Sequence, residues 1–287
     1  MIPLAWDPLV IQALSDIAPD DTEGAKIWWE LYAPAIYAAL LDSFSVSDSS
    51  GLRESDDIAG WIQDYLDRAP LTPAQDAWKK AGLLFIFIGG RYYTMKGLRV
   101  APSQIFGSLN KALQVSNVST SSLCTSLRNG TISLRAWQMQ MKDNIIASNV
   151  AAGMSAAGGS MSGDIISALV GRIQFQLEHL DRFALALAAG MKLDGTVCRL
   201  MRMYVNSARG SFHAIDNLMK AGLGYTEYMN VLGAGEDHCT GGNSCPEVTA
   251  MGWQPVGTLT PIGSRKCMSN CLCRWAYRNS VTGEVWY

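Results

Sequence analysis

The stretch GDIISALVGRIQFQLEHLDRFALALAAG, residues 163–190, decides the fold class of this chain of 287 residues. Its apolar side chains recur at every third or fourth position, which places them along one face of a helix. The glycine at position 190 is suited to end that helix. The stretch therefore predicts a long amphipathic helix, whose apolar positions are Ile166, Leu169, Ile173, Leu177, Leu180, Ala184 and Leu187.

A second stretch with the same spacing follows Asp194 and closes near Gly222. Because the connection between the two stretches is short, we expect an antiparallel helical hairpin over residues 164–222. The apolar positions of the second helix are Val197, Met201, Tyr204, Ala208, Phe212, Ile215 and Met219.

The region before this hairpin combines extended and helical patterns. The segments LFIFI and RYYTMKGLRV flank Gly89 and Gly90, which predicts a short β-hairpin near residues 84–100. Helices are expected after Pro102 and after Ser133, and the stretch AAGMSAAGGSMSG, residues 151–163, predicts a connector. The predicted fold class is therefore mainly α (α+β), with a helical body over residues 81–232.

Residues 1–80 form an acidic, Trp-rich segment that differs from the rest of the chain. It holds fourteen acidic residues against five Lys and Arg, a charge near -9, and the remainder is near +7. Two or three short helices are expected there, over residues 25–41 and 54–69. Exposed aromatic side chains would favour binding to a partner, and docking on the helical body is the alternative. The tryptophans are Trp6, Trp28, Trp29, Trp61 and Trp78.

Several function classes lack their sequence signatures. The longest apolar stretch, residues 81–90, is far shorter than the roughly 20 residues of a membrane span, so no membrane contact is expected. The opening MIPLAWDPLV lacks the pattern of a secretory signal, so we expect assembly in the cytoplasm. Phosphate-loop, dinucleotide, zinc-protease and serine-hydrolase motifs are absent, which favours a protein that is not an enzyme.

Residues 233–287 form a separate Cys-rich module, with the sequence EDHCTGGNSCPEVTAMGWQPVGTLTPIGSRKCMSNCLCRWAY over residues 236–277. This segment has few apolar residues, and a Zn²⁺ ion held by thiolates contributes about 10 kcal/mol in small zinc modules. The expected cofactor is therefore Zn²⁺, held by Cys239, Cys245 and two of Cys267, Cys271 and Cys273. His238 is a further candidate, and two disulfides, unpaired thiols or an iron–sulfur cluster are the alternatives.

The remaining cysteines and histidines are expected to be structural. Cys124 and Cys198 lie in helical stretches and are predicted to be buried small apolar residues. His179 lies beside Glu178 and Arg182, where ordinary helical ion pairs are expected. His213 lies within an amphipathic helix.

The C-terminal string resembles the end of the phage head-morphogenesis proteins, the Mu F-like minor capsid proteins. Upstream, a looser similarity extends the resemblance to residues 84–280. The five residues between Cys239 and Cys245 depart from the usual two of that family, which affects the geometry of this cysteine pair. The matching residues are Asp237, His238, Cys239, Cys245, Gly252, Trp253, Pro261, Ile262, Gly263, Cys267, Asn270, Cys271, Cys273 and Tyr277.

The resemblance implies a structural protein of a tailed-phage head that acts in head assembly or genome delivery. Its expected partners are portal or capsid subunits of the virion, with homo-oligomerisation and proximity to DNA as open alternatives. A second function class is a nucleic-acid-binding zinc module. That class would bring Arg265, Lys266, Arg274 and Arg278 to a phosphate backbone.

Overall fold

The computed structural model of the chain describes residues 62, 73–82, 85–88, 91–94, 98–159, 161–233 and 239–286. Helices make up 61% of these residues and small antiparallel sheets most of the regular remainder, which confirms the predicted mainly helical α+β class. The helices predicted over residues 25–41 and 54–69 lie outside the described residues, apart from the buried Ile62. The same holds for the tryptophans of residues 1–61.

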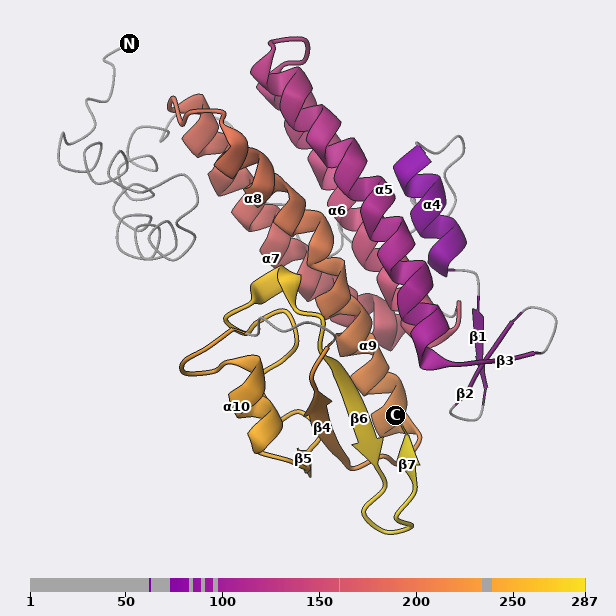
Figure 1. Cartoon of the computed structure of the whole chain (residues 1–287). Coiled ribbons are helices and arrows are strands. Elements are labelled where there is room, and N and C mark those ends of the chain that lie inside the picture. Colours follow the sequence, from indigo (N-terminus) through magenta and orange to yellow (C-terminus); the bar gives the residue numbers. More distant parts are fainter. Residues whose placement is uncertain are drawn as a thin grey trace.

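The helical body consists of α4 (Pro73–Gly82), α5 (Pro102–Arg128), α6 (Leu134–Ala157), α7 (Gly163–Ala188), α8 (Gly195–Asn206) and α9 (Ala208–Gly222), arranged as in Figure 1. Helix α6 lies at its centre and packs against each of the other five helices. The hydroxyl of Ser133 caps α6 by accepting a hydrogen bond of 3.1 Å from the backbone N–H of Ala136, as its position in the sequence suggests. The main apolar core therefore surrounds α6.

The predicted connector over residues 151–163 is wrong in its first half. Residues 151–157 continue α6 and are buried, and the turn begins only at Gly158, which has a left-handed backbone conformation. A side-chain carbon added to Gly153 would lie 2.8 Å from Leu169 Cδ1. Because small side chains let two helices approach closely, the Gly/Ala composition reflects tight packing of α6 on α7.

The two helices predicted over residues 164–222 are present, but the second is divided at Ser207 into α8 and α9. The Ser207 hydroxyl contacts the carbonyl of Tyr204 and lies 2.5 Å from Gln176 Oε1 of α7. Hydroxyl groups that bond to the preceding turn compete with helix continuation. The division therefore has a local cause within the hairpin.

A disulfide bond links α5 to α8 through Cys124 and Cys198, whose Cα atoms lie 5.6 Å apart. Cys124 is fully buried, as expected, but neither cysteine is the unpaired apolar residue that the sequence predicted. The two cysteines are 74 positions apart, so no local pattern indicates their pairing. None of the described helices combines the length and the hydrophobicity that crossing a membrane requires.

The predicted β-hairpin is formed by β1 (Phe85–Ile88) and β2 (Arg91–Thr94), in which Phe85 lies opposite Thr94. A third strand, β3 (Arg99–Val100), adds to β2 and leads into α5. The buried ring of Tyr92 on β2 packs into the main core. This sheet therefore covers the end of the helical body near α9.

The Cys-rich module is built on a second antiparallel sheet, in the order β5 (Gln254–Pro255), β4 (Glu227–Val231), β6 (Arg274–Arg278) and β7 (Val285–Trp286). Strand β4 comes from residues that the sequence analysis placed with the helical body. Helix α10 (Cys245–Ala250) and the 3₁₀ helix η1 (Met268–Asn270) complete the module, which has its own apolar cluster around Tyr228 and Trp275. Figure 1 shows the module beside α9.

Candidate metal centre

The five cysteines of the module converge at one place, although they come from separate segments. Cys239 precedes α10, Cys245 begins it, Cys267 and Cys271 flank η1, and Cys273 precedes β6. All five are free thiols. The side chains of Cys245, Cys271 and Cys273 are buried, and those of Cys239 and Cys267 are partly exposed.

Cys245 is the centre of this cluster. Its Sγ atom lies 3.2 Å from Cys267 Sγ and 3.5 Å from Cys271 Sγ. The thiols form two groups, Cys239 with Cys245 and Cys267, and Cys245 with Cys271 and Cys273, and the ligand atoms of each group lie within 4.8 Å of one another. Sulfur atoms around a tetrahedral zinc ion lie roughly 3.8 Å apart, given Zn–S bonds of about 2.3 Å. The cysteine clusters could therefore hold a metal ion.

The turn between Cys239 and Cys245 accounts for their unusual spacing. Gly241 and Asn243 both have left-handed backbone conformations, with φ of 86° and 64°, and these reverse the chain within five residues. The backbone N–H of Cys245 then donates a hydrogen bond of 3.2 Å to Cys239 Sγ. The longer gap is thus compatible with both thiols reaching one site.

The pKa values of the thiols reflect their burial and their hydrogen bonds with one another. Burial raises the pKa of Cys245 to about 12, and hydrogen bonding to Cys271, followed by burial, raises the pKa of Cys273. The pKa of Cys239 is lowered, because hydrogen bonds from Cys245 and Cys267 outweigh its burial. Buried thiols stay protonated at neutral pH unless a metal ion replaces the protons. A metal ion would therefore relieve the cost of burying their sulfur atoms as thiolates.

The basic residues proposed for a phosphate backbone are not equally available. Arg265 is 2% exposed and lies inside the module, so the interpretation of this residue as a surface contact is wrong. Arg278 pairs with Glu227 at 2.7 Å and lies over the ring of Trp253. Lys266 is exposed and Arg274 is partly exposed.

The three histidines differ in where they lie relative to the cysteines. His179 contacts Phe175 edge to face, beside the ion pair of Glu178 and Arg182 at 3.6 Å. His213 is buried on α9, packs against Phe106 and Phe212, and is hydrogen-bonded to the backbone of Cys273. His238 and Asp237 lie in the segment 234–238, which the structure does not describe.

Residues of the GTLTPIGS stretch connect the module to the helical body. Ile262 is buried, and Gly263 has a left-handed conformation with φ of 92°. A side-chain carbon at Gly263 would lie 3.3 Å from the Cα of Gly210 on α9. This close approach of two backbones places the module against the first turn of α9, a contact that no sequence pattern indicated.

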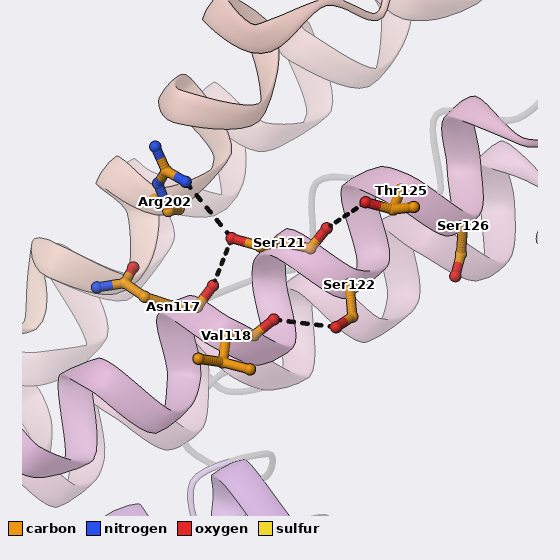
Figure 2. A pocket seen from close by; sticks show the side chains of 7 residues that line it. All are labelled: Asn117, Val118, Ser121, Ser122, Thr125, Ser126 and Arg202. Carbon is orange, nitrogen blue, oxygen red and sulfur yellow. Dashed lines mark hydrogen bonds between the residues drawn. The ribbon is translucent and has the colours of Figure 1, made fainter.

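Figure 2 shows a second candidate, an open groove on α5 beside α8. Three of its four hydroxyl groups are already engaged, since Ser121, Ser122 and Thr125 donate to carbonyls of α5 at 2.8, 3.1 and 3.0 Å. Arg202 donates to Ser121 Oγ at 3.5 Å. Among the described residues, the cysteine cluster is therefore the stronger candidate. The groove is lined by Asn117, Val118, Ser121, Ser122, Thr125, Ser126 and Arg202.

No protein-family model, curated protein or solved structure matches the chain.

Proposed function

We propose that the chain is a structural, non-catalytic protein of a tailed-phage head, a minor capsid or head-morphogenesis component associated with the portal or the capsid interior. The observation that carries the proposal is that the described part of the C-terminal string resembling such proteins, residues 239–277, is one folded unit. Its five cysteines meet around Cys245, and its Ile262 and Gly263 contact the helical body. The protein would act in head assembly or genome delivery.

The ion in this proposal is Zn²⁺, which would hold the module together. Thiolate ligands select soft or borderline ions, and tetrahedral zinc sites with four cysteines are typical of small structural modules. The chain offers five thiols at suitable spacing, with Cys245 shared by both groups. Elemental analysis of protein purified under reducing conditions is expected to find one zinc ion per chain.

The link between Cys124 and Cys198 also fits a protein that leaves the cell. Disulfides are rare in the reducing cytoplasm and persist in oxidising surroundings such as those of a released virion. Metal-bound thiolates in the module would meanwhile be protected from such pairing. The two sets of cysteines would thus serve different stages, with metal bound during assembly and the helical link formed later.

The proposed partner surface is the acidic, Trp-rich segment, because its charge near -9 and five tryptophans suit a basic portal or capsid subunit. A deletion that tests it should spare α4, because Ser155 Oγ of α6 donates to Ala81 O at 3.1 Å. We therefore remove residues 1–61. The shortened chain is expected to remain folded and to be lost from phage heads.

Incorporation of the shortened chain at the normal copy number would exclude this segment as the attachment element.

The nucleic-acid alternative is tested on the full chain, by measuring DNA affinity at low and moderate salt. A steep fall with rising salt would favour direct binding to phosphate groups. Retention in DNA-free heads at either salt concentration would favour attachment to the shell or portal.

A further inference from the structure

Arg265 stands out within the Cys-rich module because its charged group is buried against a thiol. The residue is 2% exposed. Its guanidinium Nη1 lies 3.9 Å from Cys245 Sγ, and the group lies 4.8 Å from the centre of the Trp275 ring. A charge removed from water in this way is costly unless an opposite charge accompanies it.

The hydrogen bonds of Arg265 do not supply that charge. Nη1 donates to Asn230 Oδ1 at 2.7 Å, and Nε donates to the carbonyl of Thr260 at 3.0 Å. Both acceptors are neutral. The remaining nitrogen, Nη2, is buried and has no hydrogen-bond partner in the described part of the chain.

The described carboxylates of the module are engaged elsewhere. Glu227 pairs with Arg278, and Glu247 accepts a hydrogen bond of 2.7 Å from the backbone of Asn243. Glu284 accepts from the Tyr225 hydroxyl at 3.2 Å. Among the described residues of the module, the thiol of Cys245 is therefore a group in contact with Arg265 that can carry negative charge.

The helical body places a second cation at the same cluster. Arg209, at the start of α9, donates from Nη1 to the carbonyl of Ser269 in η1 at 3.4 Å. Burial lowers the pKa of its guanidinium, and attraction to Cys271 opposes that shift. Its other terminal nitrogen donates to Asn110 Oδ1 at 3.0 Å, so Arg209 acts on the thiols through charge and not through a hydrogen bond.

We propose that Arg265 is the buried counter-ion of an anionic metal–thiolate centre and acts on it through Cys245 Sγ. The inference rests on the metal centre proposed above. Four thiolates around one Zn²⁺ ion carry a net charge of -2, so a buried guanidinium offsets part of it. Groups outside the ligand set commonly hydrogen-bond the ligands and tune the affinity of a metal site. Arg265 is thus a positioning residue and not a ligand.

The test measures Zn²⁺ affinity by competition with a chromophoric chelator, together with the absorption spectrum of the Co²⁺-substituted protein. Arg265→Met removes the charge and keeps an unbranched apolar stem, and Arg265→Lys keeps the charge but loses the planar fork. The matched control is Arg278→Met. Arg278 also lies 4.8 Å from a tryptophan ring of the module, but it pairs with a carboxylate.

Arg265→Met is expected to weaken Zn²⁺ binding about ten- to a hundredfold and to shift the thiolate-to-cobalt absorption. Arg265→Lys should lose clearly less affinity than Arg265→Met, since the charge remains although the planar fork is lost. Arg278→Met should leave affinity and spectrum unchanged. Circular dichroism of each variant reports whether the helical body stays folded.

An equal loss of Zn²⁺ affinity in the folded Met and Lys variants would assign the effect to the hydrogen bonds with Asn230 and Thr260 and would overturn the proposal. Unfolding of both variants would overturn it too, because Arg265 would then be needed for the fold and not for its charge at the metal centre. Unchanged affinity in Arg265→Met would overturn it as well. Failure of the unmodified protein to bind Zn²⁺ or Co²⁺ is a separate result, because it removes the proposed metal centre itself.

Discussion

Tyr277 of strand β6 donates a hydrogen bond of 2.8 Å to Oδ2 of Asp216 on helix α9. The other carboxylate oxygen of Asp216 lies 4.0 Å from Lys220 Nζ and 3.5 Å from the Tyr92 hydroxyl. Both charged side chains are buried, and Lys220 Nζ also lies 3.5 Å from the centre of the Trp286 ring. One carboxylate thus joins the sheet of β1, β2 and β3, the helical body and the Cys-rich module.

Replacing this carboxylate should destabilise the whole protein. Asp216→Asn removes the negative charge of Asp216 beside the buried Lys220, and such changes typically cost about 3–5 kcal/mol. Urea unfolding followed by circular dichroism measures the free energy. The control is Asp76→Asn, which breaks an exposed ion pair of 2.7 Å with Lys80 and should cost about 1 kcal/mol or less. Equal effects at the two sites would contradict the structural role of Asp216.

The contribution of Lys220 to the stability of the protein should rise between pH 8 and pH 10. Burial lowers the pKa of Lys220 to about 8, against the opposing attraction of Asp216, whereas the ordinary value is 10.5. Between these values the unfolded chain binds more protons than the folded one, so the free energy of unfolding increases with pH. The full range corresponds to about 3 kcal/mol, and this stability is lost as pH falls towards 8.

The measurement for Lys220 compares the unmodified protein with Lys220→Met at several pH values. Burial and Asp216 raise the pKa of Tyr277, and burial raises that of Cys245, so deprotonation of these groups in the unfolded chain opposes folding at high pH in both proteins. The difference between the two proteins therefore isolates Lys220. We therefore restrict the comparison to pH 7.5–9.5. If the stability difference between the two proteins does not change with pH, Lys220 has the same pKa in the folded and in the unfolded chain, and the prediction is wrong.

The disulfide between α5 and α8 should contribute substantially to stability under oxidising conditions. It closes a loop of 74 positions, for which the loss of chain entropy in the unfolded state corresponds to about 4 kcal/mol. Cys198→Ser is expected to lower the free energy of unfolding by an amount of this order. Reduction should lower it in the unmodified protein but not in the variant. Peptide mapping without reduction would reveal any other pairing.

Substitution of single cysteines should rank the thiols of the cluster. Cys245→Ser is expected to abolish Zn²⁺ binding, because Cys245 belongs to both groups of thiols. Cys239→Ser should weaken binding without abolishing it, since Cys239 is partly exposed and four other thiols remain. Zinc content after dialysis distinguishes the two. Full zinc content in Cys245→Ser would show that the ion occupies a different set of ligands.

How far the sequence predicts this fold depends on how local each signal is. The periodicity of residues 163–190 is sufficient to predict α7, because the residues that form one face of a helix lie three or four positions apart in the sequence. The clustering of the five cysteines likewise gave the candidate site. Pairing of β4 with β6, in contrast, joins Val231 to Arg274, and no short-range pattern encodes that contact.

The burial of Arg265 could not be foreseen for a related reason. In the sequence, Arg265 is followed by Lys266 and Cys267, a pattern that predicts an exposed, solvated surface. Only the folded sheet places its guanidinium over Trp275. Residues 151–157 show the opposite case, a predicted connector that is a buried helix. Glycine and alanine favour flexibility in an isolated segment but allow close packing when a neighbouring helix is present. Both outcomes were decided by distant residues.

The contact between Gly263 and Gly210 provides a test of how the module is joined to the helical body. Gly263→Ala would introduce a carbon 3.3 Å from the Cα of Gly210 at a backbone φ of 92°. Gly257 is the matched control, because it has a φ of 95° but open space around the position of an added carbon. Both alanine variants carry a similar backbone cost of about 1 kcal/mol or more, so their difference isolates the contact with α9.

We expect Gly263→Ala to be the less stable of the two and to expose the region around η1 to limited proteolysis. Equal stability and equal protease resistance would mean that the first turn of α9 yields without cost, and that the module is held by Tyr277 and Asp216 instead.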